Sequence, residues 1–472
     1  MTAYISDLPT TWLSLKLGDV VGYGKTEKAE PEEIAPDTWV LELEDLEKDT
    51  TKVLQHLTFA ERQSKSTKNK FNAGDVLYGK LRPYLNKVTF ADRPGVCTTE
   101  ILPIKPNEAV HGRYLFHWLR HPAFLTYVTE VSHGVNMPRL GTDAGRDAPF
   151  VLAPKAEQKR IADKLDTVLT RVDAVNTRLA RVAPLLKRFR QSVLAAATSG
   201  RLTNPSENVQ KITPIVLRES ECKELPKGWA WRQLTSLARL ESGHTPRKSV
   251  ESYWAGGDVP WISLQDIREA DGKVIFDTKF HPTNDGIANS SARLLPVGTV
   301  CFCRDISFGY VTVMGKEMAT SQHFANWVCG SELLPIYLMY AFIAARDSLA
   351  MSGQGSTVTT IYMPALKALK IAVPPIHEQT EIVRRVETLF AFADRLEARL
   401  AQAQTAATRL TPALLAKAFR GELVPQDPND EPAAELLRRL QAQRATAVSA
   451  SKTGTGRGRG RTAVAAPAVT EN

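Results

Sequence analysis

Apolar residues recur along two long stretches of the chain with the spacing of a coiled-coil helix. Between residues 161 and 193, and again between 382 and 414, apolar positions alternate at intervals of four and three. Each narrow stripe predicts a helix of about 40 residues, roughly 60 Å long, whose seam pairs with a second seam. The alternative is two surface helices packed on separate domains. The positions expected to pair are Ile161, Leu165, Val168, Val172, Leu179, Ile382, Val386, Leu389, Leu396 and Leu400.

Both stretches carry signals for where a helix begins and ends. Pro154 and Pro375 suit helix starts, and Gly200 and Gly421 suit helix ends. Pro184 lies inside the first stretch, and an interior proline removes a backbone hydrogen bond. We therefore expect a kink or a break in the first helix at this position.

The two stretches are copies of each other at an offset of 221 residues. Glu157 and Gln158 fall on Glu378 and Gln379, and the alignment continues without a gap as far as Gly421. A weaker echo precedes each copy, with Leu-Pro and Trp at 8, 9 and 12 and again at 225, 226 and 229. The chain is therefore a tandem duplication of one unit of about 220 residues, in the order globule, helix, globule, helix. An internal two-fold axis would make the two helices antiparallel.

Short apolar runs in the two globules predict a mixed α/β fold. The expected strands lie within residues 74–81, 87–92, 258–264, 298–304 and 309–315. The fold class is therefore α/β, with two similar globular domains separated by two long antiparallel coiled-coil helices. The expected boundaries are 1–152 for the first domain, 153–202 for the first helix, 203–222 for a linker, 223–373 for the second domain, 374–425 for the second helix, and 426–472 for a C-terminal segment with a flexible basic tail.

The positive charge of the chain is concentrated outside the globules. The 472 residues carry a formal charge of +9. Residues 1–150 and 221–372 have net charges of −2 and +1, whereas 151–220 and 373–472 have +7 and +3. A uniform basic coat is excluded, so a nucleic acid would have to bind local patches.

Composition indicates a reducing compartment. Five cysteines are few for this length and odd in number, so a disulfide framework is not expected. The first 11 residues lack the apolar core of a signal peptide, and the apolar run 333–345 is too short to span a bilayer and predicts a buried helix. We expect a cytoplasmic protein.

No catalytic motif survives inspection. Gly24-Lys25-Thr26 resembles the end of a phosphate-binding loop, but the glycine needed five positions earlier is Asp19. Cys301 and Cys303 sit in an apolar run typical of a core strand rather than of a zinc site. The chain also lacks the Asn/Asp-Pro-Pro-aromatic tetrad of amino-methyltransferases and a helicase-type ATP site. We expect a protein that is not itself an enzyme and holds no metal.

Candidate DNA contacts lie in two parts of the first globule. Residues 62–87 hold seven basic side chains against one acid, and a second polar loop precedes the first long helix. Lys and Arg bind phosphates, and Arg and Asn also read purine edges. A solvated lysine-rich loop is the alternative. The candidates are Lys65, Lys68, Lys70, Lys80, Arg82, Tyr84, Asn86, Lys87, His133, Asn136 and Arg139.

In the second globule the run 243–249 is too polar for a core. Trp254 and Trp261 nearby are better explained as core residues. The candidates for DNA contact in this globule are His244, Thr245, Arg247, Lys248, Arg304 and Gln322.

These stretches together resemble the DNA-specificity subunit of type I restriction–modification systems. The matching runs are KFNAGDVLYGKLRPYLNKV and CTTEILPIKP in the first globule, and GHTPRKSVESYWAGGDVPWISLQDI and GSTVTTIYMPALKALKIAVPP in the second, with the EQ-initiated helices that end in SGRL and RGEL. The resemblance covers about residues 8–425. The first globule lacks the GxTP, YW and PW block of the second, so their target sequences should differ.

The resemblance implies a function and a set of partners. Each globule would read one half of an asymmetric bipartite site in double-stranded DNA. The helices would set the unread spacer and dock methyltransferase subunits, two of them by expectation. Those subunits would bring S-adenosylmethionine and methylate adenine N6, and restriction subunits would bring ATP-driven translocation and cleavage with Mg, so no cofactor is expected in this chain. A recognition module acting without these partners and a coiled-coil scaffold that binds only proteins are the alternatives.

Overall fold

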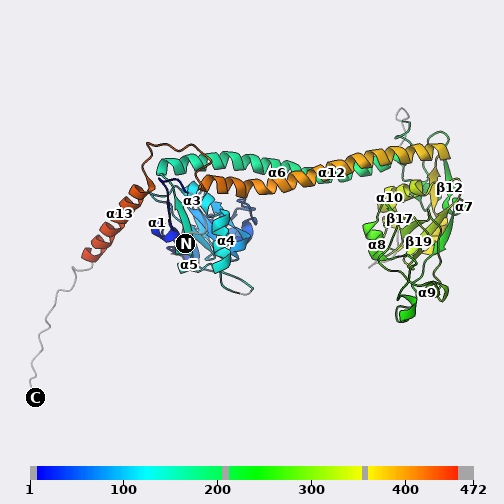
Figure 1. Cartoon of the computed structure of the whole chain (residues 1–472), viewed down its shortest axis with the longest axis horizontal. Helices are drawn as coiled ribbons and strands as arrows, with labels where there is room; N and C mark the ends of the chain where they lie inside the picture. Colours follow the sequence, from blue (N-terminus) through cyan, green and yellow to red (C-terminus); the bar gives the residue numbers. More distant parts are fainter. Residues whose placement is uncertain (1–7, 135, 205–211, 353–359, 455–472) are drawn as a thin grey trace, which may run out of the picture. The chain divides into compact units, whose positions relative to one another are not determined.

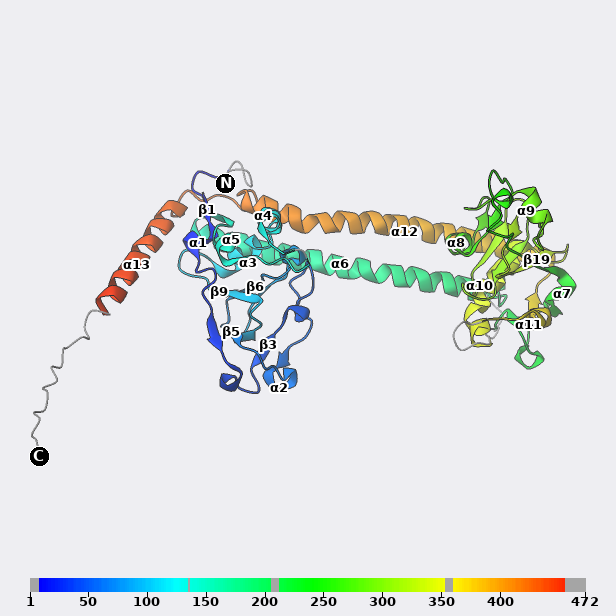
Figure 2. The same cartoon turned by 90° about the horizontal axis from the view of Figure 1, so that it is seen from below.

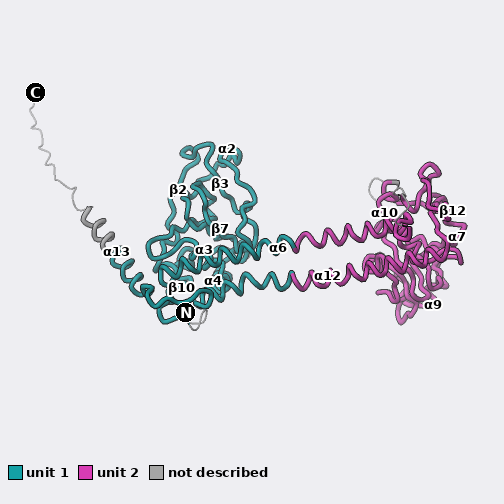
Figure 3. The backbone as a smooth tube through the Cα atoms, turned by 90° about the horizontal axis from the view of Figure 1, so that it is seen from above, with its two compact units in different colours: residues 1–178, 404–472 teal, residues 179–403 magenta. Residues whose placement is uncertain are grey.

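The computed structural model describes residues 8–134, 136–204, 212–352 and 360–454. The chain forms two compact units, one made of residues 1–178 and 404–472 and the other of residues 179–403. Figure 3 colours the two units, and each is described by itself below. No helix among the described residues is long and apolar enough to cross a membrane.

Two long helices, α6 (Lys155–Ala197) and α12 (Ile376–Phe419), each contribute one part to each unit. In the first unit, Ile161 and Leu165 near the start of α6 share a core with Leu415 and Phe419 at the end of α12. In the second unit the order is reversed, because Val193 and Ala197 at the end of α6 share a core with Ile382 and Val386 near the start of α12. The helices therefore lie side by side and antiparallel within each unit (Figures 1 and 2), as the repeat predicts.

The predicted helix ends are confirmed, but a break at Pro184 is not found. Both helices start directly after Pro154 and Pro375. Gly200 and Gly421 have φ of +79° and +77°, which a glycine adopts without strain. α6 is assigned as one helix through Pro184, and α12 also contains a proline, Pro412. A proline removes one hydrogen bond of a long helix, and packing of the helix face outweighs this loss here.

The first head (residues 13–152) has three sheets and a helical layer. The two-stranded sheet joins β1 (Leu13–Lys16) to β10 (Pro149–Leu152), and the three-stranded sheet has the order β7 (Val88–Phe90), β6 (Val76–Gly79), β9 (Ile101–Ile104). The five-stranded sheet has the order β2 (Glu27–Ala29), β5 (Lys68–Phe71), β8 (Gly95–Cys97), β3 (Trp39–Leu41), β4 (Leu57–Thr58). The helices are α1 (Leu17–Val20), α2 (Phe59–Arg62), α3 (Gly112–Trp118), α4 (Pro122–Val131) and α5 (Thr142–Arg146), with 3-10 turns η1 (Pro31–Glu33), η2 (Leu43–Asp45) and η3 (Pro83–Leu85).

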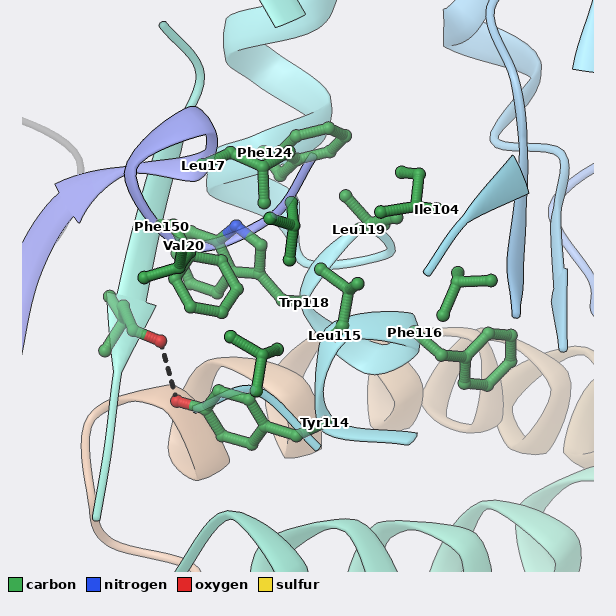
Figure 4. Packing of buried hydrophobic residues seen from close by; sticks show 14 of the residues in the cluster. Leu17, Val20, Ile104, Tyr114, Leu115, Phe116, Trp118, Leu119, Phe124 and Phe150 are labelled. Carbon is green, nitrogen blue, oxygen red and sulfur yellow. Dashed lines mark hydrogen bonds between the residues drawn. The ribbon is translucent and has the colours of Figure 1, made fainter. Parts of the chain in front are cut away.

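Helix α3 connects this head to the long helices. Figure 2 shows α3 close to α6, while α2 and the sheet that holds β3 and β5 lie farther from it. Tyr114 and Trp118 of α3 are fully buried, and the Tyr114 hydroxyl donates to the carbonyl of Val151, as Figure 4 shows with a dashed line. Trp118 also packs edge-on against Phe419 of α12, with ring centroids 5.0 Å apart. The core of the first head therefore continues into the helix pair.

The second head (residues 215–373) repeats this plan with different strands. The joining sheet has the order β11 (Ile215–Val216), β20 (Lys370–Val373), β12 (Ala230–Gln233), and β14 (Trp261–Ile262) pairs with β18 (Ala319–Thr320). The five-stranded sheet has the order β13 (Ala238–Ser242), β19 (Phe324–Cys329), β16 (Val300–Cys303), β17 (Val311–Met314), β15 (Val274–Ile275). The helices are α7 (Leu234–Leu237), α8 (Leu264–Glu269), α9 (Asn284–Ala288), α10 (Pro335–Ser352) and α11 (Met363–Ala368), with 3-10 turns η4 (Glu219–Glu221) and η5 (Glu251–Tyr253).

The predictions for the globules are confirmed at the level of elements. All five expected strand regions contain a strand, and α10 is the buried helix expected around residues 333–345. Cys301 and Cys303 are fully buried in β16, as expected for a core strand. The mixed α/β fold class is thus confirmed for both heads.

Two segments predicted to lie outside the globules take part in them. The stretch 203–222 contains β11, which pairs with β20 of the second head, so its last third is part of a sheet rather than a linker. The C-terminal segment contains α13 (Ala433–Gly454), and Ala433 and Leu440 are buried in the core of the first unit. The expected basic tail lies almost entirely in residues 455–472, outside the described residues.

Candidate nucleic-acid interface

In the first head, two candidate segments far apart in sequence form one surface. The backbone N–H of Arg82 donates to the carbonyl of Pro138 at 2.7 Å, and that of Leu140 donates to the carbonyl of Lys80 at 2.9 Å. Arg139 forms isolated β-bridges with Leu81 and His133. Residues 80–86 and 133–139 therefore make a single feature, called the first-head ridge below.

The backbone of the first-head ridge is strained. Arg82 and Asn86, on either side of η3, have φ of +50° and +49°, in the left-handed region that non-glycine residues seldom adopt. Such conformations cost about 1–3 kcal/mol each and occur often at functional sites. Between them, Pro83 is buried while Tyr84 is 45% exposed. The strained turn therefore holds an aromatic ring in solvent beside Arg82.

Polar side chains of the first-head ridge face solvent. Arg82, His133, Asn136 and Arg139 are all exposed. The Arg82 guanidinium donates to the carbonyl of Asn136 at 3.4 Å, and Arg139 donates to Glu100 at 3.1 Å. Two guanidinium groups and an amide on one exposed edge are able to bind phosphates or read purine edges.

The lysines of the basic run 62–87 are placed differently. Lys68 is 3% exposed, and its ammonium group donates to Glu42 at 2.7 Å. Lys70 lies 3.6 Å from Glu27, and Lys87 donates to the carbonyl of Leu43, where burial lowers its pKa. Lys65 is exposed and Lys80 is half-buried. The contacts of Lys68 and Lys87 are internal, so the run is not one continuous basic strip.

In the second head, four of the six candidates lie together. The Thr245 hydroxyl donates to the side-chain oxygen of Gln322 at 2.5 Å, and Arg304 donates to the carbonyl of Gln322 at 3.2 Å. The backbone N–H of His244 donates to the carbonyl of Thr320 at 2.9 Å. Arg247 and Lys248 follow on the same exposed loop. Residues 244–248 with Arg304 and Gln322 are called the second-head ridge below.

Two tryptophans support the second-head ridge from beneath. The Trp261 indole N–H donates to the carbonyl of His244 at 3.0 Å, and that of Trp254 donates to the carbonyl of Arg247 at 3.3 Å. Trp261 is 4% exposed, which confirms its expected core position, while Trp254 is half-buried.

The predicted helix seam is buried over most of its length. Ile161, Leu165, Val172, Ile382, Val386 and Leu400 are buried, and Val168, Leu179, Leu389 and Leu396 are half-buried. Two further positions of the same stripes, Val175 and Leu410, are each 44% exposed. The stripe is thus less continuous than its sequence spacing suggests.

Hydrogen bonds that the sequence did not reveal join each long helix to its head. The Glu157 carboxylate accepts from the Trp12 indole at 2.8 Å. The Gln158 side chain donates to the carbonyls of Ala109 and Ala153 at 2.9 and 2.8 Å, and accepts from the N–H of His111 at 2.8 Å.

The second unit repeats this arrangement 221 residues later. Glu378 accepts from the Trp229 indole at 3.1 Å. Gln379 donates to the carbonyls of Glu332 and Pro374, both at 2.9 Å, and accepts from the N–H of Leu334 at 2.8 Å. The spacing shared by the tryptophan echo and the EQ pair was the signal for this contact in the sequence. Each set is called a joint below.

A polar cavity of about 180 Å³ lies between the first head and the helices of the first unit. His117 is buried in its wall and lies 2.8 Å from Asp166, and burial lowers the pKa of His117. Arg113 and Arg120 line the same cavity, and the Nε of Arg120 has no hydrogen-bond partner among the described residues.

Among the described residues, no three His, Cys, Asp or Glu side chains are grouped so as to hold a metal ion. Burial raises the pKa of the Cys303 thiol to about 11, and that of Cys301 further still. Neither thiol is therefore prepared to act as a thiolate ligand or nucleophile.

Comparison with known proteins finds one family. The family described as type I restriction modification DNA specificity domain matches residues 9–183 and 226–404. The EcoBI specificity subunit of Escherichia coli is 30% identical over 376 residues, which is 75% of each chain. The StySPI specificity subunit of Salmonella potsdam is 29% identical over 373 residues, which is 73% of this chain and 74% of that one.

Solved structures share the fold. The HsdS subunit from Thermoanaerobacter tengcongensis matches with a TM-score of 0.58 at 20% identity, over 89% of this chain and all of that chain. A chain from a study of assembly and conformational transition in the type I R-M system matches with a TM-score of 0.69, also at 20% identity and over 89% of this chain. Part of one run that carried the resemblance, residues 355–359, lies outside the described residues.

Proposed function

The chain belongs to the type I restriction–modification DNA specificity family, and from that premise we propose that it is the DNA-recognition subunit of a type I restriction–modification complex. Each head reads one half of an asymmetric bipartite site in double-stranded DNA. The paired helices set the unread spacer between the halves and dock the methyltransferase subunits.

The observation that carries this proposal is a repeated joint that bears two different polar ridges. Glu157 with Gln158, and Glu378 with Gln379, connect helix and head by equivalent hydrogen bonds. The ridges that the two heads expose share no residue pattern. Two surfaces that differ in shape and charge select different base sequences, so the two halves of the site differ.

We assign the chemistry of the complex to its partners. Methyltransferase subunits bind S-adenosylmethionine and methylate adenine N6, and restriction subunits use ATP and Mg for translocation and cleavage. The specificity chain itself is non-catalytic and works in the cytoplasm. Because the joint occurs twice, the chain offers two equivalent docking places, which supports two methyltransferase subunits for each chain.

Half-site reading is assigned to the two ridges. In the first head we assign Arg82, Tyr84 and the 133–139 loop, and in the second head Thr245, Arg247, Lys248, Arg304 and Gln322. Lys65, Lys70 and Lys80 contribute charge near the first half-site. Lys68, Asn86 and Lys87 act mainly by holding the ridge in shape, because Lys68 and Lys87 have internal partners and Asn86 is a strained turn residue.

Replacing Arg82 with Ala tests the assignment in the first head. Loss of a guanidinium that reads a base edge costs about 1–3 kcal/mol and relaxes the sequence preference at one position of the first half-site only. The measurement is fluorescence anisotropy of labelled duplexes at several salt concentrations. Arg93→Ala is the matched control, because Arg93 is an exposed arginine of the same head whose partner is the adjacent Asp92.

The salt dependence separates the alternatives. If Arg82 instead binds a phosphate, all sequences weaken equally and the salt slope falls by about 1. Unchanged affinity and unchanged preference would show that Arg82 does not touch DNA. Absence of salt-dependent binding by the wild-type chain would contradict the proposed function and favour a scaffold that binds only proteins.

A further inference from the structure

An aromatic pocket lies directly beneath the second-head ridge. Its volume is about 280 Å³, and its walls are Trp254, Trp261, Phe280 and the side chain of Lys248. The two indoles meet edge to face with centroids 5.4 Å apart, and residues 261 and 280 form an isolated β-bridge. Phe280 is 44% exposed, so this ring is presented to solvent although it closes one side of the pocket.

The polar atoms of this pocket are already engaged. Both indole N–H groups donate to backbone carbonyls of the ridge, those of His244 and Arg247. The aromatic rings are thus left to interact through their faces and edges alone. An occupant is held here by stacking and not by hydrogen bonds to the tryptophans.

The rim of the pocket is cationic. Lys248 lines it and Arg247 precedes Lys248 on the exposed loop, while the Lys279 ammonium group lies 5.8 Å from the Phe280 ring centroid. None of these three cations has a carboxylate within salt-bridge distance among the described residues. A flat aromatic ligand that carries negative charge next to it fits this combination, and a cationic ligand does not.

The pocket also lies toward the free end of the second head. Trp254 directly follows η5, and η5 packs against α9 through hydrogen bonds from Thr283 to Ser252 and Tyr253. Figure 1 shows α9 at the end of this head farthest from α12. The pocket is therefore not covered by the helix pair of its own unit.

We propose that this pocket takes one nucleobase of the bound DNA, unstacked from its neighbours in or beside the second half-site, while Lys248 holds an adjacent phosphate. This rests on the proposed function and extends it from reading base edges to distorting the duplex. Base–aromatic stacking is worth about 1–3 kcal/mol per base and tolerates any base, which offsets the cost of unstacking. The pocket therefore favours sequences whose bases unstack easily rather than one particular base.

The test is a double-mutant cycle between pocket and DNA. Duplexes that carry the recognised site have each base of the second half-site and its flanks replaced in turn by an abasic residue, and each is bound to the wild-type chain and to the Phe280→Ala variant. We expect Phe280→Ala to weaken the intact duplex about 10-fold, and to have no effect on a duplex that lacks the one base that enters the pocket.

Two further variants keep the result interpretable. Trp254→Phe retains an aromatic ring and should bind intact DNA within about 3-fold of the wild type, whereas Trp254→Ala should reproduce the effect of Phe280→Ala. Phe276→Ala is the matched control, because Phe276 is an exposed phenylalanine (65%) that does not line the pocket. Far-UV circular dichroism of each variant shows whether the head remains folded.

The outcomes are distinct. Additive effects of Phe280→Ala and abasic substitution at every position would overturn the inference and leave the proposed function standing. The same holds if Phe280→Ala weakens assembly with methyltransferase subunits but not DNA binding, since the pocket would then hold a protein side chain. If the wild-type chain shows no salt-dependent DNA binding, the proposed function fails and the inference with it.

Discussion

Tyr114 in α3 and Tyr337 in α10 donate to the equivalent carbonyls of Val151 and Ala372, so the two helices correspond in the two units. Three residues further on, the first unit has His117 and the second has Tyr340. His117 borders a polar cavity, whereas Tyr340 packs against Phe390 of α12 with ring centroids 5.9 Å apart. Equivalent positions are thus empty in one unit and filled in the other.

The long helices account for this difference. At the offset of 221 residues, Phe390 corresponds to Leu169 and Arg190 corresponds to Thr411, and both Leu169 and Thr411 line the cavity. In the second unit, Arg190 lies over the Phe390 ring at 5.1 Å and pairs with Asp394 at 2.7 Å. The first unit has smaller residues at both positions, which leaves the space open.

Duplication therefore preserved one kind of contact and released another. The joints use buried hydrogen bonds to the backbone, and losing one partner leaves the other unsatisfied. The cavity region depends on side-chain volume and charge, which vary at lower cost. Three predictions follow from contrasting these two classes of contact, and they concern the joints, a buried histidine and the cavity.

Replacing Gln158 or Gln379 with Ala should destabilise only the unit to which that joint belongs, by about 4 kcal/mol. Each glutamine makes three hydrogen bonds, and its loss leaves two carbonyls and one N–H of the backbone buried without a partner. Hydrogen–deuterium exchange resolved by peptide should show faster exchange in the affected unit.

The matched control for both variants is Gln402→Ala, because Gln402 is an exposed glutamine of α12. It should leave exchange unchanged. Equal acceleration of both units by Gln158→Ala would contradict the idea of two separate joints.

Acid should destabilise the first unit and spare the second. Burial lowers the pKa of His121 to about 4, and its Nδ1 accepts from the N–H of Ala123. The ordinary pKa of histidine is about 6.5, so the unfolded state binds the proton first, and stability is complete above pH 6.5 and lost below it. The loss should be about 2 kcal/mol at pH 5 and about 3 kcal/mol at pH 4.

His121→Asn is the variant that checks this prediction. Asn accepts the same helix-capping hydrogen bond but does not titrate. Exchange in the first unit of this variant should depend less on pH than in the wild type. The four histidines among the described residues of the second unit are exposed or half-buried, so that unit serves as an internal reference. Equal acid sensitivity of both units would refute the assignment.

Phe390→Leu should open in the second unit the space that exists in the first, at a cost of about 1–2 kcal/mol. Leu169→Phe is the reverse change, and it should alter the stability of the first unit by less than about 1 kcal/mol because the cavity has room for the larger ring. Peptide-resolved exchange again separates the units. A larger cost for Leu169→Phe than for Phe390→Leu would mean that the cavity is not spare volume.

Most of the architecture followed from periodicity and repetition. The apolar stripe from Ile161 and its copy from Ile382 located the helices, and Pro154 and Pro375 their starts, because local sequence controls helix ends. Continuity through Pro184 did not follow, since packing stabilises a helix that local preference would interrupt. The pairing of β11 with β20 also depends on tertiary structure, and no short-range signal marks it.

The site was predictable by residue type but not by arrangement. The sequence identified both Arg82 and Arg139, yet only the chain path brings their segments together. A count of charges cannot tell the exposed Lys65 from Lys68, whose partner Glu42 lies 26 positions away. The left-handed conformation of Arg82 and Asn86 carries no sequence signature, because it is imposed by the surrounding contacts.

The most direct test of the account is a map of N6-methyladenine in cells with and without this chain. Two different heads on one pair of helices predict that removal of the chain abolishes methylation at one asymmetric motif, made of two unlike halves separated by a fixed gap. Arg82→Ala should then alter only one half of that motif. An unchanged methylation map, in cells where the partner subunits are expressed, would contradict the assignment of this chain as the DNA-recognition subunit.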